Sequence, residues 1–270
     1  QNSITVSHLM KLQDEHLHII VLDNSLDNYV KENKEYFPKD LLTYHSMGEN
    51  VGLSKAYNYA LSILKNKSDD SIVIWFDDDT PVTQEYLSCL KDKSKDKTYD
   101  VFVPVIYGQN GVIYSPNEKG WLKGKYIKNA KQKIPQNKFN AINSCLAVRL
   151  KAYKGYVYDE GLFMDCVDTK LFDDFRNKGI KFCVLPVKIS QNFFQRSENQ
   201  DVQKYWTRFK IRIKDTLYYS QLEGISHMIG GYIRIVGWSV IYGLKLKSIK
   251  FSLLCIAQML SYRRKNDNKN

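Results

Sequence analysis

The sequence predicts an α/β fold, with a mainly parallel sheet flanked by helices and a helical C-terminal extension. Over the first 105 residues, short apolar runs alternate with helical patterns, which is typical of parallel strands joined by crossover helices. Beyond residue 200 the short runs give way to long helical stretches that mix aromatic and basic side chains. We therefore expect an α/β unit over residues 1–200 and a helical segment over residues 201–270.

The first elements can be assigned in order along the chain. Ser3 is a suitable N-cap for a helix that runs to about His16. The run HIIVLD then predicts a buried strand that ends at Asp23. A polar helix over residues 27–36 is expected to end before Pro38. Three further strands are predicted at residues 41–44, 71–76 and 100–106, and a helix is predicted at residues 52–64.

The next part of the chain is more irregular. Residues 107–140 are polar and lack a helical period, so we expect a loop or small hairpin over the site. A strand at residues 141–150 follows, and then an acidic helix at residues 163–176. The last strand-like runs are residues 181–185 and 187–191, which Pro186 separates.

Composition limits the possible partners and location. The five cysteines are scattered without metal-binding spacing, and the N-terminus shows no secretory pattern. Together these features predict reduced thiols and a cytoplasmic location. From residue 201 onward there are thirteen Lys or Arg against four acids, so nine of the eleven net positive charges lie there. This asymmetry favours an anionic partner, either nucleic acid or an anionic membrane surface.

The apolar stretches of the C-terminal segment suit a membrane surface better than a membrane span. Neither reaches the roughly 18–20 uninterrupted apolar residues that a spanning helix needs. We expect helices lying at the inner face of the membrane. The alternative is that these helices pack on the α/β unit or form a homodimer interface.

The strongest local signal is the run Asp77-Asp78-Asp79, directly after an apolar strand. Ligands bind at the carboxyl ends of strands in such sheets. Closely spaced carboxylates there would bind Mn²⁺ or Mg²⁺, and the metal would bridge them to a diphosphate. The alternative is an acidic turn that caps the next helix before Pro81.

With these motifs in order, the chain resembles the inverting family 2 glycosyltransferases of the GT-A fold, especially the rhamnosyltransferase-like branch. The segments that carry the resemblance are IIVLDNSLD, ENVGLSKAYNYAL, WFDDD and GLFMDCVDTKLFDDFRNKGIKF. They agree in order and spacing across residues 3–194. The resemblance implies a Rossmann-like GT-A sheet over residues 1–200 and a nucleotide-sugar donor.

The resemblance also implies roles on the donor side. Asp23 corresponds to the residue that contacts the nucleotide base, and Asn50 and Gly52 to the turn that brings a helix N-terminus close to the donor phosphates. In the acidic run, which is the DxD motif of the family, Asp79 is expected to bind the metal directly. Asp77 would contact the ribose or sugar and share the metal, and Asp78 completes the nucleotide-sugar site. Ordinary turn formation, helix capping and close packing are the alternatives for Asp23, Asn50 and Gly52.

On the acceptor side the resemblance makes Asp168 the general base. Asp165 lies three residues earlier, so on a helix the two carboxylates would share one face. The alternative is that both only complement the helix dipole. Three departures from the family are visible. Its usual first strand would precede Gln1, and Gln191 stands where a metal-binding His is common. Asp168 and Arg176 are also spaced more widely than in the common acid-to-Arg pattern.

These expectations combine into one functional hypothesis. The chain would move rhamnose or another hexose from a UDP- or dTDP-sugar to a lipid-linked or cell-surface polysaccharide acceptor. A noncatalytic protein of the same fold and a basic nucleic-acid-binding protein are the alternatives. The second is disfavoured because no recognised nucleic-acid module occurs in the sequence.

Overall fold

A five-stranded sheet forms the centre of the molecule, and four of its strands lie in one row. The computed structural model describes residues 3–267 except 13, 15, 26–32, 34–41, 123 and 194–201. The strand order is β10-β4-β9-β3, and β10 is parallel to β4 while β9 is antiparallel to both β4 and β3. Three of these strands therefore share one direction, as predicted. Their bounds are Ile72–Trp75 for β3, Val101–Gly108 for β4, Leu146–Arg149 for β9 and Phe182–Gln191 for β10.

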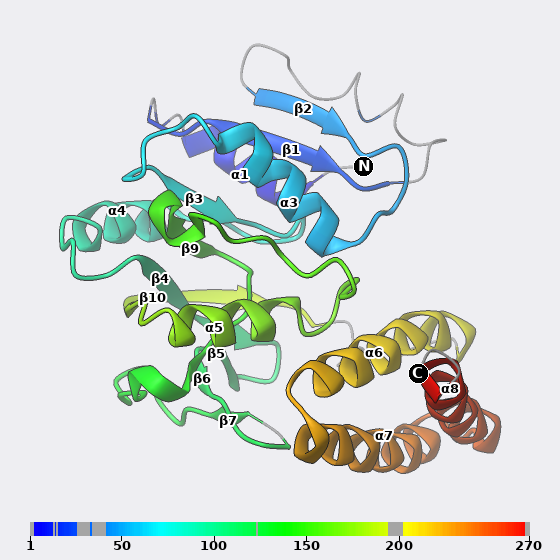
Figure 1. Ribbon diagram of the computed structural model, residues 1–270. Coiled ribbons are helices and arrows are strands. Elements are labelled where there is room, and N and C mark those ends of the chain that lie inside the picture. The colour runs from blue at the N-terminus through cyan, green and yellow to red at the C-terminus, as the bar shows by residue number, and fades with distance from the viewer. Residues whose placement is uncertain are drawn as a thin grey trace.

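Two further groups of strands lie beside this sheet. β1 (Ile19–Asp23) and β2 (Leu42–Ser46) form a parallel pair, and in Figure 1 their arrows point the same way as that of β3. The carboxyl ends of β1 and β3 thus lie on one side of the molecule. β5 (Ile113–Ser115) pairs with β4, and a small sheet has the order β7-β6-β8. The segment predicted as a loop or hairpin therefore contains short strands: Asn117–Glu118 for β6, Lys125–Tyr126 for β7 and Phe139–Asn140 for β8.

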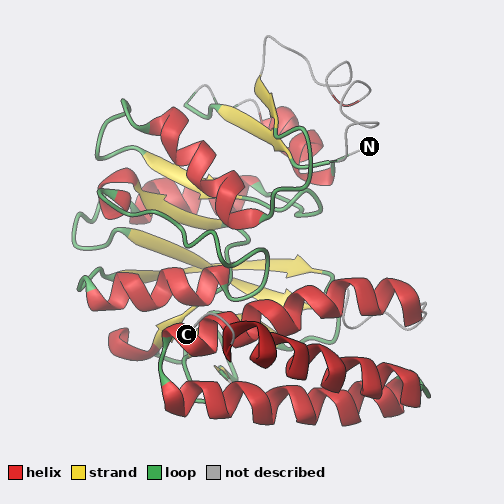
Figure 2. Ribbon diagram, turned by 45° about the vertical axis from the view of Figure 1, so that its right-hand side comes forward, coloured by secondary structure: helices red, strands yellow, loops and turns green. Residues whose placement is uncertain are grey.

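Helices cover both faces of the main sheet (Figures 1 and 2). α3 (Leu53–Leu64) and α5 (Val167–Asn177) share one hydrophobic core with Val101, Val103 and Val105 of β4. α1 (Ile4–Leu12) and α4 (Gln84–Lys93) share a second core with Phe102 and Ile106 of the same strand. Successive side chains of a strand point to opposite faces, so this apolar strand supplies both cores. Short 3-10 turns at Gln136–Lys138 and Leu150–Tyr153 flank β8 and β9.

Several predicted boundaries were wrong. The acidic helix starts at Val167 rather than residue 163, because Cys166 before it has a left-handed backbone with φ of 63°. β10 continues through Pro186 because the register with β4 shifts between Val184 and Lys188; a proline without an N–H is tolerated at such an irregularity. The first helix is capped by Ser3 as predicted but ends at Leu12. The helix predicted at residues 27–36 lies outside the described residues.

The C-terminal segment folds into three helices with their own core (Figure 2). α6 (Val202–Leu222), α7 (Ile225–Lys245) and α8 (Ile249–Asp267) follow one another directly. Phe209, Ile213, Ile235, Phe251 and Cys255 lie in the core of this helical unit. Among the residues that the structure describes, no helix is long and apolar enough to cross a membrane.

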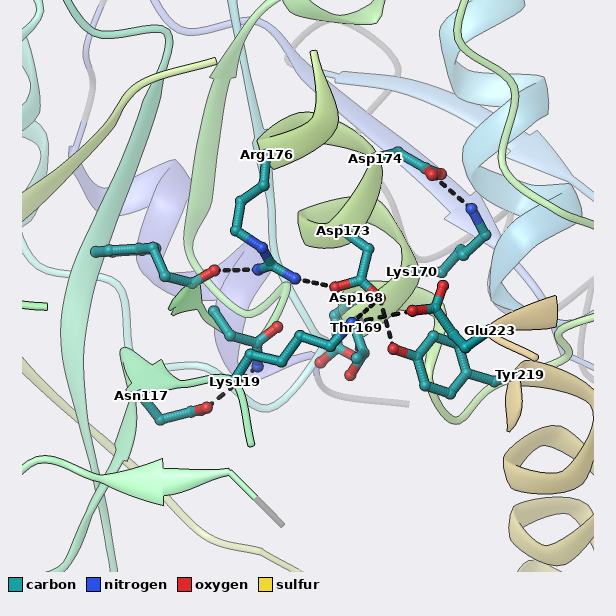
Figure 3. Close-up of polar contacts among 12 residues, drawn as sticks. Asn117, Lys119, Asp168, Thr169, Lys170, Asp173, Asp174, Arg176, Tyr219 and Glu223 are labelled. Atoms are coloured by element: carbon teal, nitrogen blue, oxygen red, sulfur yellow. Dashed lines mark hydrogen bonds and ion pairs between the residues drawn. The ribbon is translucent and has the colours of Figure 1, made fainter. Parts of the chain in front are cut away.

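One buried carboxylate joins the helical unit to the sheet (Figure 3). Asp173 of α5 pairs with Arg176 and with Lys119, at 2.7 Å from the Lys119 nitrogen. It also accepts a hydrogen bond of 2.5 Å from Tyr219 of α6. Lys119 in turn pairs with Glu223, which follows α6, at 3.1 Å. The Asp173 side chain is only 5% exposed, so its charge depends on these partners.

We predict that Asp173→Asn lowers the free energy of unfolding by about 3–5 kcal/mol, the usual cost of breaking a buried ion pair. Urea denaturation measures this loss. Asp174→Asn is the matched control, because Asp174 pairs with Lys170 on the same helix but is 26% exposed; a pair of that kind contributes about 0.3–0.5 kcal/mol. Equal losses in the two variants would contradict the assignment.

Candidate functional site

The first turn of α1 fixes the backbone of the acidic turn. Thr5 donates its backbone N–H to the carbonyl oxygen of Asp78 at 3.2 Å, and its hydroxyl donates to the carbonyl of Asp77. The same hydroxyl accepts from the backbone N–H of Thr80 at 2.8 Å. Residues 77–80 therefore keep one backbone arrangement at the end of β3. Sequence reasoning missed this contact, which joins residues 75 positions apart.

The carboxylates of this turn are electrostatically uncompensated. Burial raises the pKa of Asp77, and the negative charges of Asp79 and Asp78 raise it further. Burial also raises the pKa of Asp79, again with help from Asp78. Among the described residues, no Lys or Arg forms an ion pair with any of the three. A cation bound here would relieve this repulsion.

Gln191, the last residue of β10, lies beside the acidic turn. Its side-chain nitrogen donates to the Asp77 carboxylate at 3.2 Å. Its Oε1 is buried and has no hydrogen-bond partner in the part of the chain that the structure describes. A 180° rotation of the amide would turn that oxygen toward the carboxylates. The residue therefore stands where the resemblance placed it, and it brings an unused oxygen.

These residues fit a divalent cation that shares its ligands with a diphosphate. The described residues contain no cluster of three His, Cys, Asp or Glu that would hold a metal alone. Mg²⁺ usually takes one or two carboxylates together with phosphate oxygens, rather than a complete protein cage. Asp77, Asp79 and the amide oxygen of Gln191 form a hard-oxygen set of that kind.

Asp23 ends β1 and is buried. Its carboxylate accepts hydrogen bonds from the backbone N–H of Ser25 at 2.9 Å, from Asn33 at 2.8 Å and from the Tyr44 hydroxyl. Burial alone would raise the pKa of Asp23, but hydrogen bonds from Ser25, Tyr44 and Asn33 hold it below its usual value. A carboxylate has about four acceptor positions, and the Ser25 hydroxyl, the Ser25 N–H, Tyr44 and Asn33 supply four donors, so a ligand N–H would replace one of them.

The turn before α3 is tied to the end of β1. The Asn50 side chain accepts from the backbone N–H of Gly52 at 3.2 Å and from Asn24 at 3.3 Å. Asn24 also accepts from the backbone N–H of Val51 at 2.9 Å. Asn50 thus closes the turn but is not the N-cap, which is Gly52. Asn24 is a site-building residue that sequence reasoning missed.

Gly52 allows the chain entering α5 to approach α3. It has a φ of +85°, and a Cβ there would lie 2.7 Å from the Phe163 ring and from the Phe163 carbonyl oxygen. The Leu53 N–H donates to that carbonyl at 2.6 Å. Close packing, the alternative considered for Gly52, is therefore part of its role. The glycine brings the start of α3 and the segment before α5 together.

Asp168 lies in the first turn of α5 and is half-buried. Burial raises its pKa to about 6; the charge of Asp165 adds to the rise, and a hydrogen bond from the Thr169 N–H opposes it. A carboxylate that mainly complemented a helix dipole would have a lowered pKa. The raised pKa is therefore an effect of burial and not of the helix dipole.

Asp165 differs from the prediction. It precedes α5, so it does not share a helix face with Asp168. Its side chain forms an ion pair with Arg208 of α6, and its backbone N–H donates to Asp215 at 2.9 Å. The left-handed backbone at Cys166 causes this difference, because it delays the helix start.

Tyr57 of α3 lies within electrostatic reach of both Asp77 and Asp168. Its side chain is buried. Burial raises its pKa, and the charges of both Asp77 and Asp168 raise it further. The acidic turn and Asp168 therefore act on the same phenol. Helical periodicity shows only that Tyr57 is on the core side of α3, so sequence reasoning missed its position in the site.

Comparison with known families gives one match. The family model described as "Glycosyl transferase family 2" matches residues 4–157. No curated protein sequence matches the chain. The matched span includes β1, α3 and the acidic turn and ends before Asp168.

Comparison with solved structures supports the fold. A crystal structure of GalNAc-T7 with UDP, GalNAc and Mn²⁺ superposes with a TM-score of 0.52 at 17% identity. The superposition covers 81% of this chain and 47% of that one, so the chain spans less than half of that protein. A second structure, S. aureus TarS 1-349, has a TM-score of 0.48 at 14% identity and covers 89% of this chain and 70% of that one.

Proposed function

The chain belongs to glycosyl transferase family 2, and from this premise we propose that it is an inverting, metal-dependent hexosyltransferase with a UDP- or dTDP-sugar donor. The observation that carries the proposal is that the charges of Asp77 and Asp168 both raise the pKa of the buried Tyr57 phenol. Such a pair supplies a donor side and a base side within one site. Rhamnose or another hexose would be the transferred sugar.

On the donor side, four features have complementary roles. Asp23 would accept the imide N–H of the base in place of one of its present donors, and the Asn50–Gly52 turn would bring the N-terminus of α3 to the phosphates. Asp79 would bind Mn²⁺ or Mg²⁺ directly, with Asp77 beside it and Asp78 adding negative charge. When bound, such a cation neutralises the charge of the departing nucleoside diphosphate. The Mn²⁺ and UDP in the GalNAc-T7 structure support this choice of ligands.

On the acceptor side, Asp168 would act as the general base. Asp165 would hold the segment before Asp168 in position through its ion pair with Arg208. The acceptor hydroxyl oxygen attacks the anomeric carbon while the bond to the diphosphate breaks, and Asp168 takes the hydroxyl proton. A pKa of about 6 suits this role, because the carboxylate is then mostly ionised near neutral pH and still basic enough to accept the proton.

The helical unit, residues 201–270, would hold the enzyme at the inner face of an anionic membrane, beside a lipid-linked or cell-surface polysaccharide acceptor. One face of α7 exposes a stripe of six apolar side chains, which we call the α7 stripe: Ile225, Ile229, Ile233, Val236, Val240 and Leu244. Besides the inward-facing Arg234, residues 224–262 contain three basic residues near the turn between α7 and α8, Lys245, Lys247 and Lys250, and no acid. Two copies joined through this face would bring like charges together, so the charge favours lipid over a homodimer.

We predict that UDP or dTDP raises the melting temperature only with Mn²⁺ or Mg²⁺ and not with EDTA. A ligand at 100 times its Kd adds about 2.7 kcal/mol, or roughly 5–10 °C for a chain of this size. Asp79→Ala should abolish the shift, whereas Asp168→Ala should keep it. The proposal fails if no nucleotide gives a metal-dependent shift.

We expect the transfer rate to fall about tenfold per pH unit below pH 6, since Asp168 acts as a base only when ionised and its pKa is about 6. Asp168→Asn should lower kcat by about 10²–10⁴, and Asp174→Asn should not. UDP affinity is measured over the same pH range. Titration of Asp77 or Asp79 would change UDP affinity, whereas titration of Asp168 would change only the transfer rate. A pH-independent rate with unchanged donor binding would rule Asp168 out.

We predict that replacing Ile233 and Val240 together by Ser weakens binding to anionic phosphatidylglycerol vesicles at least tenfold, because burying each side chain contributes about 1.5–3 kcal/mol. Sedimentation with vesicles measures this. Val157→Ser is the matched control, because Val157 is 70% exposed outside the helical unit. Unchanged vesicle binding with a lower molecular mass in ultracentrifugation would instead identify a dimer interface.

A further inference from the structure

The hairpin of β6 and β7 packs against the first half of α7 (Figure 1). Trp121 and Leu122 lie in the turn between the two strands. A Cβ placed at Gly230 of α7 would lie 3.2 Å from the Leu122 side chain and 3.5 Å from the Trp121 ring. The turn therefore rests directly on α7, although the two segments are far apart in the sequence.

Trp121 extends the exposed apolar surface of α7 onto this hairpin. The residue remains 49% exposed despite its contact with Gly230. Ile233 of the α7 stripe lies three residues after Gly230 and is 51% exposed, and residues with that spacing are neighbours on a helix surface. The indole therefore lies at the edge of the α7 stripe. Tryptophan is enriched where proteins meet the headgroup region of a membrane.

Residues 119–138, which we call the basic segment, surround Trp121 with positive charge. They contain seven Lys and no acid. Lys119 is engaged by Asp173 and Glu223, and Glu118 stands opposite Lys125 in the strand pair. Five lysines are exposed and form no ion pair within the part of the chain that the structure describes: Lys125, Lys128, Lys131, Lys133 and Lys138.

Apolar and basic groups thus occur together on one surface, and this combination selects the partner. A soluble polyanion would use the lysines but would leave the α7 stripe and Trp121 in water. A second copy of the chain would cover the stripe but would bring two basic segments together. An anionic membrane satisfies both, because its headgroups attract the lysines and its interface accepts the apolar side chains.

The hairpin is connected to the edge of the sheet that carries the acidic turn. Tyr126 of β7 packs against Tyr114 with ring centres 5.1 Å apart, and Tyr114 packs against Phe193 at 4.7 Å. Phe193 is two residues beyond Gln191, whose amide donates to Asp77. A membrane contact at the hairpin would therefore place lipid-linked molecules beside this edge of the sheet.

We propose that Trp121 and the basic segment form a second membrane contact, which binds an anionic bilayer together with the α7 stripe. The inference rests on the proposed function, because it takes the α7 stripe as a membrane-binding face. No bond forms or breaks: the indole enters the headgroup region and the lysines stay at the lipid phosphates. Two contacts, one on the α/β unit and one on the helical unit, fix the orientation of the site relative to the bilayer.

The test is sedimentation of the full chain with phosphatidylglycerol vesicles at two salt concentrations. Lys131→Gln combined with Lys133→Gln should weaken binding about tenfold or more at low salt, because each Lys near an anionic surface strengthens binding about fivefold. The difference should shrink at high salt, which screens exposed charges. The matched control is Lys65→Gln with Lys67→Gln, since these exposed lysines follow α3, outside the basic segment.

Trp121→Ser tests the apolar part of the contact. It should weaken vesicle binding by about threefold or more at both salt concentrations, because the loss of apolar burial is not screened by salt. Trp121→Phe, which keeps an aromatic ring on Gly230, should retain most of the binding. Unchanged melting temperatures show that the variants fold.

The outcomes separate this contact from the proposed function. Vesicle binding that is weakened by Ile233→Ser with Val240→Ser, but not by the lysine or Trp121 variants, overturns the second contact and leaves the proposed function standing. Vesicle binding through the basic segment by a chain that binds no UDP with metal overturns the proposed transferase, while the surface stands. Binding of soluble polyphosphate through Lys131 and Lys133, without any vesicle binding, overturns the membrane assignment.

Discussion

A hydrogen bond of 2.6 Å between the Leu53 N–H and the Phe163 carbonyl joins the start of α3 to the segment that leads into α5. The contact requires a close approach of the two segments, and only the absence of a side chain at Gly52 leaves space for the Phe163 ring. From this contact the chain runs in one direction to the Asn50 turn and in the other to Asp168. The Asn50 turn and Asp168 therefore have a fixed relation that neither segment would set alone.

Strand ends were predicted well because their signal is local. Apolar runs ended by an aspartate place Asp23 and the acidic run at the edge of the sheet, and the structure has β1 and β3 there. The start of α5 could not be predicted in this way. A left-handed backbone at a cysteine has no sequence pattern, and it moves Asp165 off the helix and into contact with Arg208.

The contacts that shape the site were less visible because they are long-range. Thr5 and Asn24 act through backbone groups of distant turns, and the sequence around each is ordinary. The charge of the C-terminal segment was visible from composition alone. The separation of the exposed α7 stripe from Arg208, which pairs with Asp165, depends on helix rotation within a three-helix core, which composition does not determine.

The backbone amides of Met164 and Asp165 find their acceptor on residue 215, fifty positions later along the chain. The last helices are therefore not an accessory added to a finished catalytic unit. A chimera that exchanged the tail of this protein for that of a relative would leave the segment before Asp168 with the wrong partners, unless residues 161–166 were exchanged with it. Acceptor preference and the tail would then be inherited together, as one module that crosses the apparent boundary near residue 200.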